Sequence, residues 1–160
     1  MVEGPLEHAR SEFTFTVQAP MAEAFPLFGP EGERGWAGPH WDPQFVYPNP
    51  ASTPGPVPAK DVEGAVFRIQ HGHHAATWVN TVFDAQAGHA AFVYVIEGRL
   101  ATRIDVQLSP VDAETTRVRV MYERTALSPS SNPDVLEMSQ RDAKMGPEWE
   151  KDIAAYLSRK

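Results

Sequence analysis

The sequence predicts an α+β domain in which successive antiparallel strands form one sheet and helices cover one of its faces. The first observation is a series of alternating apolar and polar runs after residue 64, separated by turns of three to six residues. The second is the single apolar stripe of a long helix near the C-terminus. The third is size, because 160 residues with 42% hydrophobic side chains can bury a sizeable core. We therefore expect one domain over residues 1–160, with its core at about 11–157.

The strands and short helices can be predicted in chain order. The first strand is Glu12–Gln18, because Phe13, Phe15 and Val17 alternate with polar residues. Pro20 then suits the first position of a short helix, and Glu31–Trp36 is compatible with a second one. Gln44–Tyr47 is at best a short edge strand. Five longer strands follow, at Ala65–His71, Ala75–Asp84, His89–Ile96, Leu100–Ser109 and Thr116–Ala126.

The last element is a helix over about Pro133–Leu157. Asn132 is a suitable N-cap, and the proline that follows it fits the first helical turn. Gly146 and Pro147 interrupt the stripe, so a kink is expected near Ala143.

A proline-rich segment divides the chain before the main run of strands. Six of the 15 prolines lie between Pro43 and Pro58, a spacing that neither a long helix nor a central strand tolerates. We expect an irregular surface loop over about 48–59, with Asn49–Ala59 as its main part.

The turns predict which residues share the inner face of the sheet. A turn at residues 97–99 with Gly98 left-handed pairs Ile96 with Leu100, and Tyr94 then lies opposite Thr102. If Leu108 pairs with Thr116, Thr102 also lies opposite Tyr122. Three hydroxyls would then form a row on an apolar wall. Either they bond to each other, to the backbone or to trapped water, or they are the polar contacts of a ligand cavity.

The outer face of the same strands collects charged side chains, with Asp105 expected opposite Arg119. We interpret it as a solvated surface with cross-strand pairs. For Ala75–Asp84 two registers remain, and size favours the one that turns Trp78, Asn80 and Val82 inward. The outer-face residues of the other strands are Arg103, Asp105, Gln107, Arg117, Arg119 and Glu123.

This layout resembles the START-like, or SRPBCC, superfamily over nearly the whole chain. The resemblance rests on the first strand, on Pro30–Trp36, on Trp41–Pro43, on Thr116–Ala126 and on the helix with PEWEKDIAAYL. It implies a helix-grip fold, a seven-stranded antiparallel sheet curled around a long C-terminal helix, with two short helices after strand 1 and a hydrophobic cavity in between. The superfamily includes lipid-transfer and polyketide cyclase/dehydratase-like proteins. It has no universal catalytic motif, so the resemblance assigns no catalytic residue.

Composition excludes several classes of function. Cysteine is absent, which removes disulfides, thiol nucleophiles and Cys-ligated zinc. A net charge of −7 without a Lys/Arg cluster argues against nucleic acid as a partner. No apolar run is long enough for membrane insertion, and no signal peptide is visible, so a cytoplasmic protein is expected. No nucleotide-binding or hydrolase motif is present, and we predict no cofactor.

Three groups of side chains are candidates for catalysis or metal binding. His71, His73 and His74 resemble a metal site, but we interpret them as an exposed hairpin and predict no metal ligands. The carboxylates at Glu31 and Glu33 are interpreted as surface charge. His40, beside the expected cavity mouth, is the one candidate catalytic residue.

We therefore predict a protein that binds a small hydrophobic or aromatic molecule between sheet and helix. The alternative is a cyclase- or dehydratase-type enzyme, in which His40 works with Tyr94 or Tyr122 on a polyketide-like substrate. Homodimer formation stays open. The expected ligand contacts are Trp41, Phe67, Trp78, Phe92, Tyr94, Thr102, Tyr122 and Met145.

Overall fold

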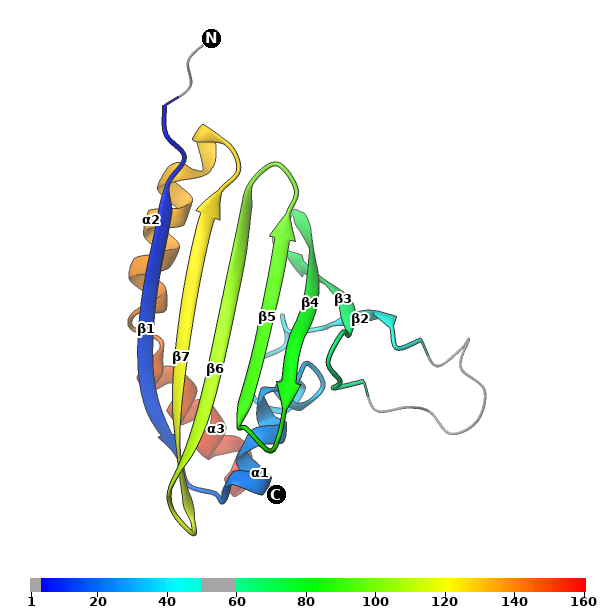
Figure 1. Ribbon diagram of the computed structural model, residues 1–160, viewed down its shortest axis with the longest axis vertical. Helices are drawn as coiled ribbons and strands as arrows, with labels where there is room; N and C mark the ends of the chain where they lie inside the picture. The colour runs from blue at the N-terminus through cyan, green and yellow to red at the C-terminus, as the bar shows by residue number, and fades with distance from the viewer. Residues whose placement is uncertain (1–3, 50–59) are drawn as a thin grey trace.

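The computed structural model describes residues 4–49 and 60–160, and it contains one seven-stranded antiparallel sheet with helices on one side (Figure 1). The central part of the expected proline-rich loop, residues 50–59, lies outside the described residues. The sheet order is β1-β7-β6-β5-β4-β3-β2. The strands are β1 (His8–Val17), β2 (Gln44–Tyr47), β3 (Val66–His71), β4 (His74–Asp84), β5 (His89–Ile96), β6 (Leu100–Asp112) and β7 (Thr115–Ala126).

Short helical segments follow β1, as predicted, and longer helices end the chain. The short ones are α1 (Met21–Ala24), η1 (Phe25–Phe28) and η2 (Gly32–Gly35), and a further turn, η4 (Pro129–Ser131), precedes the C-terminal helices. The C-terminal helix is divided into α2 (Asn132–Asp142) and α3 (Gly146–Ser158), so the interruption falls at the predicted place. The N-cap prediction was wrong. Asn132 lies inside α2, and its side-chain oxygen accepts a hydrogen bond from the backbone N–H of Glu7 at 2.7 Å.

The core lies between the helices and the concave face of the sheet. Phe13 and Phe15 of β1 pack against Trp149 of α3, with ring centroids 5.2 and 6.1 Å away. Val118 and Val120 of β7 are fully buried on the same face. The alternating pattern predicted this face correctly, since most inward residues of β5, β6 and β7 are apolar.

The predicted register is correct between β5 and β6. Ile96 pairs with Leu100 and Tyr94 with Thr102, across a turn in which Gly98 has a φ of 74°. Such a positive φ is open to glycine at no steric cost.

Between β6 and β7 the predicted register was wrong by two residues. Leu108 pairs with Val118 rather than Thr116, and Thr102 pairs with Arg124 rather than Tyr122. The β6–β7 ladder continues past Ser109 as far as Asp112, so the turn lies further out than expected. A shift of two keeps every side chain on its face but changes its partners.

On β4, Trp78 and Asn80 are buried, as the size argument favoured. A bulge between Asn80 and Val82 then reverses the alternation. As a result Phe83, and not Val82, packs against the core, with its ring 4.8 Å from that of Phe25.

Candidate functional site

A cavity of about 700 Å³ lies between the concave face of the sheet, the segment from η1 to β2, and the α2–α3 junction. The sheet, η2 and the C-terminal helices all contribute to its wall. Many lining side chains are aromatic, and Met138 of α2 and Met145 of the α2–α3 junction add flexible apolar contact. The aromatic residues are Phe28, Trp36, Trp41, Trp78, Phe92, Tyr94, Tyr122 and Trp149.

The aromatic wall is built by cross-strand pairing. Trp78 on β4 lies opposite Tyr94 on β5, and their rings stack with centroids 4.4 Å apart. Trp41 meets Trp78 edge to face at 5.2 Å, and its indole N–H donates to the carbonyl of Pro30 at 2.8 Å. Stacked and edge-on pairs of this kind fix ring orientation, so this part of the wall is preformed.

A buried ion pair joins the sheet to the helix junction. The Arg124 guanidinium, which is 4% exposed, donates from Nε and Nη2 to the two carboxylate oxygens of Asp142, at 2.6 and 2.9 Å. Burial alone would lower the pKa of Arg124. The hydrogen bonds and charge of Asp142 outweigh burial, so the pKa of Arg124 lies above its ordinary value. The pair therefore stays charged and fixes the end of α2 against β7.

The same guanidinium organises two hydroxyls of the predicted row. Its Nη1 donates to the hydroxyl of Tyr94 at 2.6 Å and to that of Thr102 at 3.0 Å. The row therefore continues into Arg124, which occupies the position expected for Tyr122. Because Arg124 holds its oxygen as an acceptor, Tyr94 has its own O–H proton available to donate.

Tyr122 lies under the guanidinium and lines the cavity. The Arg124 guanidinium carbon lies 4.9 Å from the centroid of the Tyr122 ring, a cation–π contact. The Tyr122 hydroxyl makes no hydrogen bond to any residue that the structure describes. Burial raises the pKa of Tyr122 and Arg124 opposes this only in part, so the phenol stays protonated.

Glu33 of η2 also lines the cavity, which corrects its interpretation as surface charge. The Asp61 carboxylate fixes η2 by accepting from the backbone N–H groups of Glu31 and Gly32, at 2.8 and 3.1 Å. At Gly32 a Cβ atom would overlap the carbonyl oxygen of Pro26, so this close packing requires glycine. Burial, and then the charge of Asp61, raises the pKa of the Glu33 carboxyl well above its ordinary value.

The three histidines of the β3–β4 hairpin have separate environments. His73 and His74 are exposed, as predicted, whereas His71 lines the cavity and stacks on Tyr94 with centroids 5.0 Å apart. Burial, followed by Arg124 and His40, lowers the pKa of His71, so its imidazole is neutral near pH 7. Among residues 4–49 and 60–160, no cluster of three or more His, Asp or Glu side chains could hold a metal ion.

Most of the predicted contact residues lie on the cavity wall. Trp41, Trp78, Phe92, Tyr94, Tyr122, Met145 and the candidate base His40 all line it. Phe67 and Thr102 do not. Phe67 is fully buried behind the wall against Trp78, and Thr102 lies beneath Arg124.

Sequence reasoning missed Arg124, Asp142 and Glu33. The alternation of β7 did contain the signal for Arg124, because this residue shares its parity with Val118, Val120 and Tyr122. Asp142 had no comparable signal, since its partner is 18 residues earlier and on another element.

The seven-stranded antiparallel sheet, the C-terminal helix and the hollow between them define the helix-grip fold of START-like proteins. A protein from Rhizobium leguminosarum has this fold, with a TM-score of 0.64 and 15% identity over 98% of both chains. Norcoclaurine synthase from Thalictrum flavum gives a TM-score of 0.64 at 8% identity, over 97% of this chain and 89% of the other. Ara h 8.0201 gives 0.62 at 15% identity, over 96% of this chain and 100% of the other.

These likenesses are structural, and sequence comparison adds none. No family model matches the chain, and no curated protein does. In the described part of the chain, no helix is both long enough and apolar enough to cross a membrane.

Proposed function

We propose that this protein binds a small aromatic or largely hydrophobic molecule in the cavity between the sheet and the C-terminal helices. The observation that carries the proposal is a preformed aromatic hollow of about 700 Å³ with its polar groups gathered around Arg124. Ligand sites commonly have this volume and this combination of apolar walls and few polar groups. Solved helix-grip neighbours include a plant enzyme and Ara h 8.0201, which supports small-molecule binding in general terms.

The charges around Arg124 indicate the polarity of the ligand. Arg124 carries one positive charge, which Asp142 balances at hydrogen-bond distance. Burial raises the pKa of Glu33 and lowers the pKa of His71, so it favours the neutral form of each. This group therefore has no net charge and offers mainly hydrogen-bond donors, so it favours an uncharged ligand with acceptor oxygens.

The first experiment titrates the protein with 2-acetylnaphthalene by isothermal calorimetry, with native mass spectrometry to establish the stoichiometry. We expect one molecule bound per chain. Trp78→Ala should weaken binding at least about tenfold, because it removes a stacked wall residue worth roughly 1.4 kcal/mol or more. The matched control is Thr77→Ala, at the neighbouring exposed position of β4. Absence of binding by 2-acetylnaphthalene and by simpler naphthalenes would contradict the proposal.

A second candidate is an enzyme of the cyclase or dehydratase class, favoured by one observation. A protonated carboxyl, Glu33, and a neutral imidazole, His71, line the same cavity, and His40 lies on the wall as well. Such a pair can give and take protons at neutral pH. This candidate predicts that His40→Ala or His71→Gln abolishes turnover of a bound polyketide-like substrate and leaves its affinity nearly unchanged. Equal loss of turnover and affinity would favour binding alone.

Two further expectations stay predictions. A cytoplasmic location can be measured by fractionation of the source cells, and a homodimer by sedimentation of the untagged protein.

A further inference from the structure

Several polar side chains on the cavity wall form no hydrogen bond with a described residue, namely Glu33, His40, Tyr122, Arg141, Glu148 and Asp152. Among them the carboxyl of Glu33 on η2 and the hydroxyl of Tyr122 on β7 interact electrostatically with each other. Arg124, by contrast, is buried and already bonds to Asp142, Tyr94 and Thr102. The Glu33 and Tyr122 side chains are half-buried on the cavity wall, so a ligand that displaces water from the cavity has to supply partners for them.

Both groups favour the form that carries a proton. Burial raises the pKa of the Glu33 carboxyl well above its ordinary value, and it keeps the Tyr122 phenol far from ionisation. The two also lie close enough for the charge of an ionised Glu33 to raise the pKa of Tyr122. A protonated carboxyl and a phenol can each donate one hydrogen bond, and an sp² oxygen can accept two.

We propose that Glu33 and Tyr122 form a two-donor site for the carbonyl oxygen of an aromatic ketone, aldehyde or quinone. This inference rests on the proposed function, and it names the ligand class that the cavity takes. The carbonyl oxygen lies toward η2 and β7, while the ring system lies against Trp78 and Tyr94.

The structure favours a neutral carbonyl over an anion. The Arg124 charge is held by a bidentate carboxylate and by two hydroxyls, so it is not available to balance a ligand carboxylate. Its position over the Tyr122 ring nevertheless polarises the phenol and strengthens it as a donor. A neutral carboxylic acid beside a tyrosine is also a known way to bind a carbonyl oxygen in an apolar site, as the general case of ketosteroid isomerase shows.

Both donors are held in place by packing and hydrogen bonds. Asp61 fixes η2 through two backbone N–H groups, which sets the direction of Glu33. The Tyr122 ring stacks on Phe13 at 6.4 Å and meets Trp149 edge-on at 6.5 Å. A preorganised pair gains affinity because little conformational entropy is lost on binding.

The test compares two probes of nearly the same shape, 2-acetylnaphthalene labelled with ¹³C at the carbonyl and 2-ethylnaphthalene. We expect the ketone to bind the unmodified protein about five- to thirtyfold more tightly, from one to two hydrogen bonds of roughly 1 kcal/mol each. Infrared difference spectra should show its carbonyl band moved to lower wavenumber on binding.

The variants separate the donor role from packing. Tyr122→Phe and Glu33→Leu should each reduce the preference for the ketone several-fold. In each variant the carbonyl band of the bound ketone should shift less than it does in the unmodified protein. Glu33→Gln should keep most of both, because the amide still donates. The control variants are Tyr47→Phe on β2 and Glu23→Gln on α1, both exposed and outside the cavity, and neither should change the preference.

The outcomes are distinct. Equal affinity for both probes with an unmoved carbonyl band would overturn the two-donor site and leave hydrophobic binding intact. If neither probe binds, the proposed function fails and the inference fails with it. A preference that survives both Tyr122→Phe and Glu33→Leu would also overturn the assignment to these two residues.

Discussion

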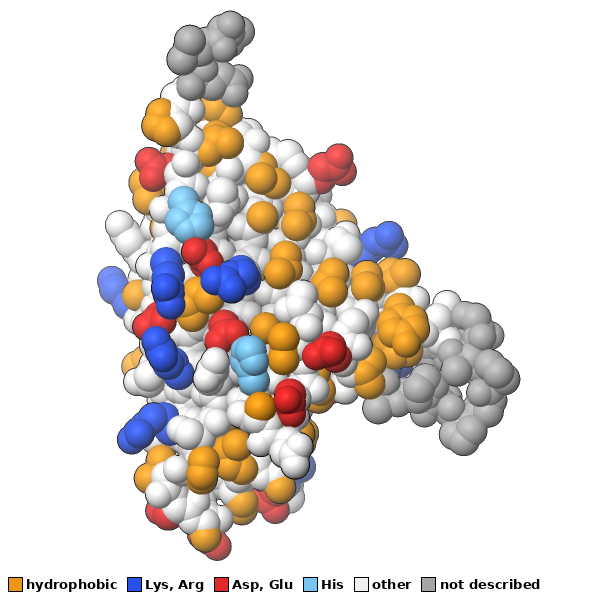
Figure 2. Space-filling view, in the orientation of Figure 1, with side chains coloured by type: hydrophobic (Ala, Val, Ile, Leu, Met, Phe, Trp, Pro, Cys, Tyr) orange, Lys and Arg blue, Asp and Glu red, His pale blue; other side chains and the backbone are white. Residues whose placement is uncertain are grey.

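The two faces of the sheet use the same types of side chain in opposite ways. On the outer face, charged residues of β1, β6 and β7 pair across strands in solvent (Figure 2). Arg103 meets Glu123 at 2.7 Å, and Arg119 meets Glu12 at 2.8 Å. On the inner face the ion pair Arg124–Asp142 is buried with two hydroxyls around it. Among residues 4–49 and 60–160, this is the one Arg–carboxylate pair that is shielded from water on both sides.

This difference determines what each charge contributes. An exposed pair gains little, because water solvates each partner nearly as well and salt screens the attraction. A buried pair has lost its hydration, so removing one partner leaves a charge that nothing solvates. The outer face can therefore change without consequence for the fold, whereas the inner face is constrained by its neighbours.

The largest expected effect comes from Asp142→Asn. The variant leaves the Arg124 charge buried opposite a neutral amide, which should lower the free energy of unfolding by about 3–5 kcal/mol. Urea unfolding followed by circular dichroism measures this loss. In the double variant Arg124→Met/Asp142→Leu most of the stability should return, because no charge remains to be buried. A loss below about 1 kcal/mol in Asp142→Asn would show that the buried pair contributes no more to stability than an exposed pair does.

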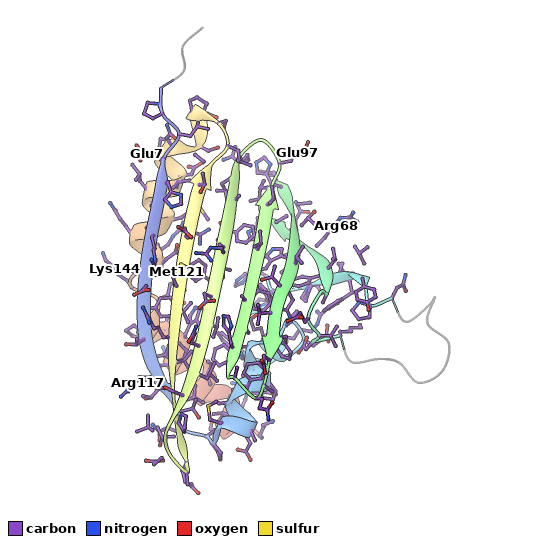
Figure 3. The ribbon with its side chains drawn as sticks, viewed as in Figure 1. Glu7, Arg68, Glu97, Arg117, Met121 and Lys144 are labelled. Carbon is purple, nitrogen blue, oxygen red and sulfur yellow. The ribbon has the colours of Figure 1, made fainter. Side chains whose placement is uncertain are left out.

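The faces also show how far the sequence allowed prediction. Alternation assigned inner and outer residues of β5, β6 and β7 correctly, because burial of one face requires it. Alternation could not set the β6–β7 register, since a shift of two residues leaves every side chain on its face. The predicted pairing of Asp105 with Arg119 was wrong for this reason. Asp105 lies opposite Met121, and a distance of 2.6 Å joins its carboxylate to the imidazole of His89. Met121 and Arg117 both lie at outer-face positions of β7 (Figure 3).

The residues of the candidate site were predictable only where the alternation within one strand indicated which side chains point inward. The turn at residues 97–99 set the register that turns Tyr94 inward, and side-chain size favoured the inward position of Trp78. Glu33 was missed because a carboxylate in a short helix is usually solvated, and its position depends on Asp61, a distant residue that binds η2. A contact between elements that are far apart in the chain produces no periodic pattern in the sequence, so it cannot be predicted from periodicity.

An intermediate effect is expected for Glu33→Gln, measured as thermal stability against pH. The folded-state pKa of Glu33 lies above its ordinary value of 4.5, so the folded protein binds more protons than the unfolded chain between these two values. Stability of the unmodified protein should therefore fall, relative to the variant, as pH rises from about 4.5, with a slope approaching about 1.4 kcal/mol per pH unit. The difference should level off above the raised pKa.

Other titratable groups near Glu33 also make stability depend on pH. The prediction therefore concerns the difference in stability between the unmodified protein and Glu33→Gln. Asp61 and Tyr122 interact with it electrostatically, and His40, His71, Arg124, Arg141, Asp142, Glu148 and Asp152 line the same cavity. Their own titration is largely common to both proteins and is removed by the subtraction. The exposed Glu23→Gln supplies the control for a Glu-to-Gln change outside the cavity. A flat difference for Glu33→Gln would mean that its carboxyl is solvated.

The smallest effect is expected on the outer face, from Arg103→Met. Arg103 donates from Nε and Nη2 to the same oxygen of Glu123, at 2.9 and 2.7 Å, yet its side chain is 60% exposed. The loss of stability should stay below about 1 kcal/mol and shrink further in high salt. The hydrogen bonds to Arg103 and His8 hold the pKa of Glu123 below its ordinary value, opposing a smaller effect of burial. Removing Arg103 should therefore raise that pKa, which NMR titration of the carboxyl can measure. A loss comparable to that in Asp142→Asn would show that outward-facing ion pairs also stabilise the fold. Hydrogen-bond geometry, rather than burial, would then determine how much each pair contributes.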